Sequence, residues 1–363
     1  MRAKSSLIAL PRRAREGFTL AELLVSVFVL LLLILMFTQL MTSATAITRS
    51  DHKHIDTDTQ AREVLDRMAV DFAQMLKRTD VDYYVKQRSG YNGHGNGHGW
   101  GQGHNGDKGS DQIAFFSHIP GYYPASYGSS LALVAYRVNE STSTNAAYGR
   151  LERLAKGLLW NGVDNGTGQN ANYPIVFSPG QLTACNNGPC DPWASAWSAA
   201  INNDNNNASS DDNYEVIGPG VFRFEYYYIL KNGRVTDWPW DRSDMPDQIT
   251  ITNPTNIGVS QVESIAVAIA VINREGRVLI DTTHSANAAY GDILDVAADL
   301  ADFKNANGNG VGGQKIGDLE DRWNTVVQSI AQTGQTPSGK LIPPEAAKGI
   351  RIYNRYFDLK TIR

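Results

Sequence analysis

An apolar segment from Phe18 to Phe37 constrains this chain more than any other part of its 363 residues. An α-helix needs about 20 apolar residues to cross a bilayer, and this segment has that length. One carboxylate, Glu22, lies near its start. A carboxylate in hydrocarbon is costly, so it marks a functional position unless it lies at the interface, where an acid is tolerated. The pattern predicts a membrane-spanning helix over residues 18–40.

The charges before this segment predict its orientation. A single acid, Glu16, stands there against the basic residues Arg2, Lys4, Arg12, Arg13 and Arg15. The positive-inside rule then places the N-terminus in the cytoplasm and the rest of the chain across the membrane. Two cleavage sites fit this order, one in the small residues 43–46 and one between Gly17 and Phe18. Glu22, inside the apolar run, argues against the first, which is an ordinary signal-peptidase site.

The residues around Gly17 resemble the class III leader of type IV pilins and type II secretion pseudopilins. The matching residues are Gly17, Phe18, Thr19, Leu20, Glu22, Leu23 and Leu24. The resemblance implies that a prepilin peptidase removes residues 1–17 as a cytoplasmic leader and that Phe18 is then N-methylated. It also implies that Glu22 pairs with the N-terminal amine of a neighbouring subunit in a filament. That pairing would offset a burial cost that is about 2.5–3.5 kcal/mol for Asp at the centre of a helix.

The helical pattern continues beyond the apolar segment. Apolar residues recur at helical spacing, and charged residues, Asp71 among them, lie on the opposite side. The apolar positions are Ala61, Val64, Leu65, Met68, Phe72, Met75 and Leu76. The pattern predicts a helix over residues 18–80 whose second half packs on a sheet. Two separate helices, divided near residues 42–43 or 52–54, are the alternative.

Residues 81–363 are expected to form a soluble α+β head, in which short strands are separated by turns. Strands are predicted over residues 112–118, 131–138, 150–160, 173–177, 221–230, 234–237, 263–272, 277–280 and 349–362. Asn232-Gly233 predicts a hairpin turn, and Arg274-Glu275-Gly276 predicts a second one. Two helices are predicted from the faces Ile293, Ala297, Leu300 and Leu319, Trp323, Val326, Val327, Ile330. The expected fold is pilin-like: a long N-terminal helix on an antiparallel sheet, with extra C-terminal helices.

Three further groups of residues suggest local chemistry. His94, His98 and His104 lie in a Gly/His-rich loop, residues 89–109, and are weak metal candidates because they lack regular ligand spacing. Cys185 and Cys190 flank a Gly-Pro turn and predict a disulfide in an oxidising compartment. An Asn-rich loop covers residues 202–213, and the pairs Asp211-Asp212 and Asp241 with Asp244 are weak calcium candidates. No cofactor is expected.

The head also resembles the minor pseudopilin J of type II secretion. The matching residues are 135–138, 149–153, 222–227, 238–240 and 245–249, with Met245 where that family has Leu. The resemblance implies a structural subunit in the bacterial inner membrane, with its head in the periplasm. Its partners would be prepilin peptidase, other minor pseudopilins, the inner-membrane assembly platform and secreted substrates. The alternative is a minor type IV pilin that acts as a tip adhesin or binding module.

The sequence offers no pattern for catalysis or for binding nucleic acid. Motifs for zinc proteases, serine hydrolases, P-loops and dinucleotide sites are missing. The formal net charge is −4 and becomes more negative when the basic leader is removed. An acidic head has no electrostatic footprint for nucleic acid. The chain is therefore expected not to be an enzyme.

Overall fold

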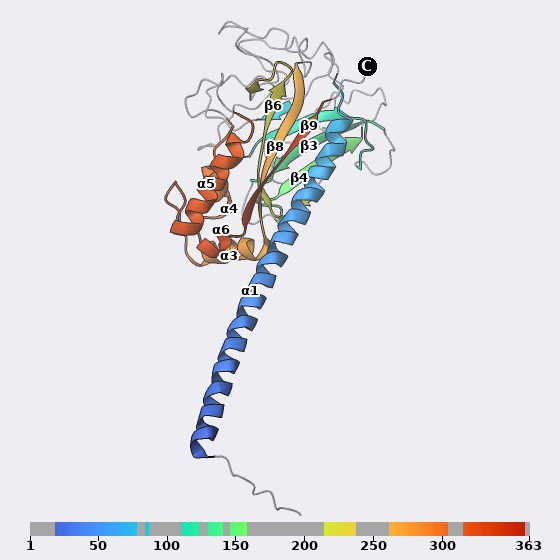
Figure 1. The fold of residues 1–363 in the computed structure, drawn as a ribbon. Helices are drawn as coiled ribbons and strands as arrows, with labels where there is room; N and C mark the ends of the chain where they lie inside the picture. The colour runs from blue at the N-terminus through green and yellow to red at the C-terminus, as the bar shows by residue number, and fades with distance from the viewer. Residues whose placement is uncertain are drawn as a thin grey trace, which may run out of the picture. The chain divides into compact units, whose positions relative to one another are not determined.

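The computed structural model describes residues 19–77, 84–86, 110–122, 130–140, 146–157, 214–236, 261–303 and 315–359, without the side chains of 44–54 and 84–86. It divides into two compact units, residues 1–52 and 53–363. The leader, the predicted strand over 173–177 and the loops 89–109 and 202–213 lie outside the described residues. Within them the fold is α+β, with one N-terminal helix, two antiparallel sheets and a group of C-terminal helices (Figure 1).

Helix α1 runs from Leu20 to Ala73 as one element, without a division near residues 42–43 or 52–54. The prediction that it continues to residue 80 is wrong. After Ala73 the chain pairs with strand β2 (Gln112–Ser117): Met75 and Ser117 form an antiparallel bridge, and the Leu76 amide donates to the Phe116 carbonyl at 2.8 Å. These pairings take up backbone groups that a further helical turn would need.

The strands form two antiparallel sheets. Sheet A has the order β1-β2-β3-β4-β5, with β1 Tyr84–Lys86, β3 Ala132–Val138, β4 Leu151–Gly157 and β5 Glu215–Gly218. Sheet B has the order β7-β6-β8-β9, with β7 Val235–Thr236, β6 Val221–Leu230, β8 Val262–Ile272 and β9 Ile350–Asp358. The short strands β1 and β5 were not predicted from the sequence.

The first predicted hairpin is confirmed and the second is wrong. Gly233, at φ 82°, turns the chain between β6 and β7. Arg274, in contrast, begins helix α3 (Arg274–Ala286), so residues 277–280 are helical. Asn273 causes this start, because its side chain accepts from the Gly276 amide at 2.7 Å as a helix N-cap. Strand β8 finds its partner in β9 instead, with Ala268 opposite Asn354.

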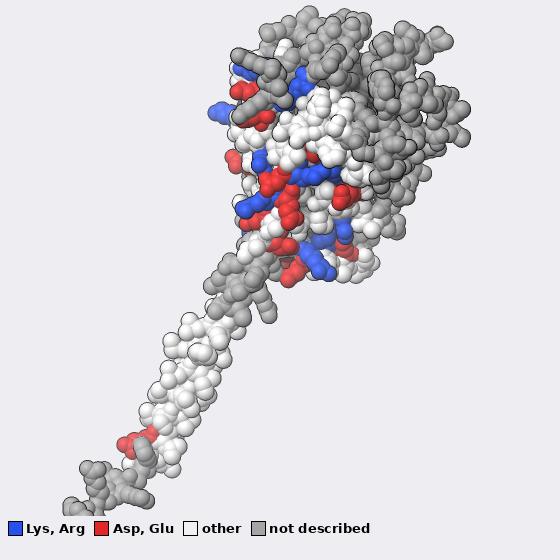
Figure 2. Space-filling view, turned by 90° about the vertical axis from the view of Figure 1, so that its right-hand side faces the viewer, with Lys and Arg blue, Asp and Glu red and all other residues white. Residues whose placement is uncertain are grey.

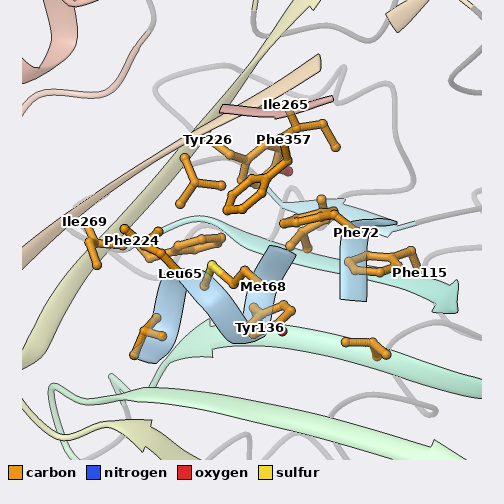
Figure 3. Close-up of a cluster of buried hydrophobic side chains, with 14 of the residues drawn as sticks. Leu65, Met68, Phe72, Phe115, Tyr136, Phe224, Tyr226, Ile265, Ile269 and Phe357 are labelled. Carbon is orange, nitrogen blue, oxygen red and sulfur yellow. The ribbon is translucent and has the colours of Figure 1, made fainter. Parts of the chain in front are cut away.

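Each face of sheet B packs against a different layer. One face contributes Phe224, Tyr226 and Ile265 to a core that also holds the apolar stripe of α1 and part of sheet A (Figure 3). The other face is covered by the C-terminal helices α3, α4 (Ile293–Asp299), α5 (Asp318–Thr333) and α6 (Pro344–Ala347). Side chains of β6 point to opposite faces of the sheet and pack into the two cores, as expected for a strand that is buried on both faces.

A turn before β4 joins sheet A to the C-terminal helices. Arg277 donates to the carbonyl oxygens of Tyr148 and Gly149 at 2.8 and 2.9 Å. The Tyr148 hydroxyl donates to Asp292, the N-cap of α4, at 2.6 Å. Helices α3 and α4 are thus hydrogen-bonded to the turn that leads into sheet A.

We predict that Gly149→Ala destabilises the head more than Gly233→Ala. Both glycines have positive φ, 59° and 82°, where a side chain costs about 1–2 kcal/mol. A Cβ on Gly149 would also stand 2.8 Å from Cγ2 of Ile293, whereas a Cβ on Gly233 meets no atom within 4 Å. Urea unfolding measures the two free energies. Equal losses would show that the contact with Ile293 relaxes without cost.

Candidate functional site

The N-terminal half of α1 contains an apolar segment, Leu20–Ser43, which is long and apolar enough to cross a membrane. An 18-residue window within these 24 residues has a mean hydropathy of 2.9, and none of that window is buried. The hydroxyls of Ser26, Thr38 and Thr42 each donate to a carbonyl three or four residues earlier, at 2.8–2.9 Å. Hydroxyls satisfied within their own helix lower the cost of placing the segment in lipid.

Glu22 is the single charged residue of this segment, and it closes the first turn of α1. Its Oε2 accepts from the Thr19 amide at 2.9 Å and from the Thr19 hydroxyl at 3.0 Å. The Glu22 amide in turn donates to the Thr19 hydroxyl at 3.3 Å. This is a capping box, in which a Thr and a Glu three residues later satisfy each other's backbone amides. Figure 2 shows a stretch of helix surface without basic or acidic colouring except for a red, acidic patch near one end.

Thr19 was missed as a partner of Glu22, although the sequence carries the signal. The spacing Thr-x-x-Glu immediately before an apolar run is the signature of a capping box. The contact restrains the Glu22 carboxylate at the N-terminal end of the apolar segment. Gly17 and Phe18, the predicted processing residues, lie outside the described residues, as do His94, His98, His104, Cys185 and Cys190.

The second half of α1 is held by a buried carboxylate, Asp71. Arg153 of β4 donates to it twice, from Nε to Oδ2 at 2.7 Å and from Nη2 to Oδ1 at 3.1 Å. Tyr136 of β3 donates its hydroxyl to Oδ2 as well. The side chains of Asp71 and Arg153 are 0% and 1% exposed. The periodicity had assigned Asp71 to the polar side of the helix; the structure corrects this, since sheet A supplies the buried partners.

The electrostatics of this group keep Arg153 charged. Burial opposes the charge on Arg153, but the hydrogen bond and charge of Asp71 raise its pKa overall. Burial and the Asp71 charge raise the pKa of the Tyr136 hydroxyl well above its usual value, so it remains a donor. Because Arg153 bonds to both oxygens of Asp71, the contact also fixes the orientation of the two side chains relative to each other. Helix α1 is therefore held in one register on sheet A.

Strand β9 provides further polar contacts with α1. Tyr353 donates its hydroxyl to Thr57 at 3.2 Å and to the Asp58 carboxylate, and Arg355 pairs with Asp66. Burial and the Asp58 contact raise the pKa of Tyr353 to about 12. The Arg355 and Asp66 side chains are 40% and 58% exposed, whereas Tyr353 is half-buried and Thr57 is buried. Basic and acidic side chains intermingle on the face of the head in Figure 2. Because an exposed ion pair contributes little to stability, the Arg355–Asp66 pair should stabilise the packing of α1 less than the buried Asp71 group does.

The described residues hold no group of three or more His, Cys, Asp or Glu side chains placed to bind a metal ion. The calcium candidates Asp211, Asp212, Asp241 and Asp244 lie outside that part of the chain. The described arrangement provides an exposed apolar helix with an acid at its beginning, continued by a helix that is locked into a head. The apolar helix is consistent with a single-pass membrane anchor.

No protein-family model matches the chain, and no curated protein matches it.

Proposed function

We propose that this protein is a minor pseudopilin-like structural subunit. It is inserted in the bacterial inner membrane with its N-terminus in the cytoplasm and its head in the periplasm. Prepilin peptidase cleaves it after Gly17, Phe18 is methylated, and the subunit joins the tip of a type II secretion pseudopilus through its apolar helix. The observation that supports this most is the order of basic leader, Gly17, Phe18 and Glu22 at the start of an apolar helix.

The head is consistent with this proposal. The apolar stripe of α1 packs on antiparallel sheets, as expected for a pilin-like subunit. Asp71 and Arg153 fix the second half of α1 on sheet A within the head. The proposal includes no catalytic residue and no cofactor, and its partners are the peptidase, neighbouring subunits and the assembly platform.

A second candidate function is a minor type IV pilin whose head binds a ligand or surface. The C-terminal helices α3–α6 favour this function. They cover the face of sheet B that α1 does not contact, and they enlarge the head beyond one helix packed on its sheets. Crosslinking in cells distinguishes the two. Links to pseudopilins and secreted substrates favour secretion, and links to a retractable pilus favour the second function.

We predict that Glu22→Val is processed normally but assembles poorly. The substitution removes the only charge of the apolar segment, and with it the proposed partner of a neighbour's N-terminal amine. N-terminal mass spectrometry should show methylated Phe18 for the wild type and the variant alike. Shearing and sedimentation of filaments should recover at least about tenfold less of the variant, the equivalent of roughly 1.4 kcal/mol.

Thr19→Val is the control for the capping box. It removes the Thr19 hydroxyl that bonds Glu22 but leaves the carboxylate in place. Loss of a capping side chain costs about 1 kcal/mol of helix stability. Assembly of Thr19→Val close to the wild type, with Glu22→Val defective, shows that the charge matters rather than the cap. Normal assembly of Glu22→Val contradicts the pairing, and an N-terminus after Ala46 contradicts the whole proposal.

A further inference from the structure

A second buried group of charges lies on the opposite face of sheet B, beneath the C-terminal helices. Arg223 and Glu225 stand on β6 with side chains 0% and 3% exposed, and Asp302, 17% exposed, follows α4. One nitrogen of Arg223, Nη2, donates to Glu225 Oε2 at 2.9 Å and to Asp302 Oδ1 at 2.6 Å. A single guanidinium nitrogen thus holds together two carboxylates from different elements.

The segment after α4, residues 301–303, is fastened at this point. The Phe303 amide donates to Glu225 Oε1 at 3.2 Å, and the Phe303 ring stacks on Tyr227 with centroids 4.3 Å apart. The Trp323 indole of α5 donates to the Ala301 carbonyl at 2.7 Å and lies near the guanidinium of Arg223. Glu225 therefore bonds both to the neighbouring charge and to the backbone of residues 301–303.

More acids than bases surround this group among the described residues. Asp111, just before β2, accepts from the Tyr226 amide at 3.2 Å and so lies beside Glu225. Glu140, after β3, accepts from the Ser110 amide and contributes a further negative charge near Arg223. Strand β8 places only Ala268 and Ala270 opposite Glu225 and Arg223. In the part of the chain that the structure describes, four carboxylates thus lie around one guanidinium, and we call these five residues, Asp111, Glu140, Arg223, Glu225 and Asp302, the Arg223 cluster.

We propose that the Arg223 cluster is a pH-sensitive latch, which holds residues 301–303 against β6 while it carries an extra proton and releases them as that proton is lost. The geometry supports this because two carboxylates share one buried nitrogen donor, with a third acid beside them. Like charges at such close range in a dry site are costly, and a shared proton relieves the repulsion. The inference concerns the head alone and does not depend on filament assembly.

The direction of the pH effect follows from Glu225. Burial, then Asp111 and Asp302, raise its pKa well above the usual value of 4.5, and Arg223 only partly opposes them. When residues 301–303 move away, the Glu225 carboxyl is exposed to water and its pKa returns towards 4.5. A group whose pKa is raised in the closed state stabilises that state at low pH, and the stabilisation is lost as pH rises through the closed-state pKa. The latch is therefore tight in acid and looser towards alkaline pH.

Amide hydrogen exchange of the full-length chain in nanodiscs tests this between pH 5 and 8. The readout is the protection factor of the Phe303 amide, after division by the intrinsic exchange rate at each pH. With one proton linked to opening, protection falls by up to about tenfold per pH unit between the open and closed pKa values. We expect at least about a tenfold fall from pH 5 to pH 7 in the wild type.

Two variants and a control give the test its specificity. Glu225→Gln keeps an acceptor for Phe303 but cannot lose a proton, so its protection should stay within about twofold over the same range. Asp302→Asn removes one negative charge beside Glu225 and so lowers the closed-state pKa of Glu225. The fall in Phe303 protection should therefore end at a lower pH than in the wild type. Glu152→Gln alters a different buried pair, with Arg137 on sheet A, and should retain the wild-type profile at Phe303. A flat wild-type profile overturns the proposal, as does a fall that persists in Glu225→Gln.

Discussion

Replacing Gly17 by alanine should leave the protein as an uncleaved precursor that does not enter filaments. Prepilin cleavage falls between Gly17 and Phe18 in the proposed function, and the added Cβ stands directly before the scissile bond. Without cleavage the α-amino group of Phe18 never forms, so Glu22 of a neighbour has no amine to pair with. The expected effect is near-complete loss of both processing and assembly.

Intact-mass and N-terminal mass spectrometry measure this result. The variant should retain Met1 or the residue after it, while the wild type starts at methylated Phe18. Ala14→Ser, also in the leader, is the matched control and should be processed like the wild type. Cleavage of the Gly17→Ala variant at the wild-type position removes the prepilin interpretation.

Replacing Asp71 by alanine should cause the largest loss of stability in the head. The change leaves Arg153, 1% exposed, as a buried charge without its carboxylate, and leaves the Tyr136 hydroxyl without its acceptor. Removing one partner of a buried ion pair typically costs about 3–5 kcal/mol. The free energy of unfolding of the purified chain, measured by urea denaturation, should fall by about that amount.

Two comparisons separate the buried charge from a general effect on the helix. Asp66 lies on the same helix as Asp71 and forms an exposed ion pair with Arg355 of β9. Its replacement by alanine should lower the free energy of unfolding by at most about 1 kcal/mol. The double variant Asp71→Leu with Arg153→Met removes both buried charges and should recover much of the loss, because hydrophobic replacements of buried pairs are often neutral. Equal losses for Asp66→Ala and Asp71→Ala would show that Asp71 contributes no more than a surface charge.

Most elements could be predicted from local pattern. Strand β6 was predicted at its exact bounds, since a run of apolar and aromatic residues ends at an Asn-Gly turn. Helices α4 and α5 were predicted from their faces, and β9 from its composition. Residues 274–280 were misassigned because a glycine after a strand resembles a turn, whereas Asn273 caps a helix there.

The polar contacts could not be predicted in the same way. Asp71 lies among charged residues on the face that periodicity marks as polar, and its partners Arg153 and Tyr136 are distant in the sequence. Nothing local distinguishes it from Asp66, which is exposed. Likewise Glu225 resembles any polar residue of an alternating strand until α4 and α5 cover that face.

The sequence by itself determined the apolar helix, the position of Glu22 and the α+β character of the head, because these depend on composition and on periodicities within a short stretch of chain. The tertiary structure alone decided which charges are buried, in what register α1 is held on sheet A, and how residues 301–303 are bonded to β6. Those properties depend on electrostatic energies between groups brought together from distant segments, and a local pattern carries no record of such distances.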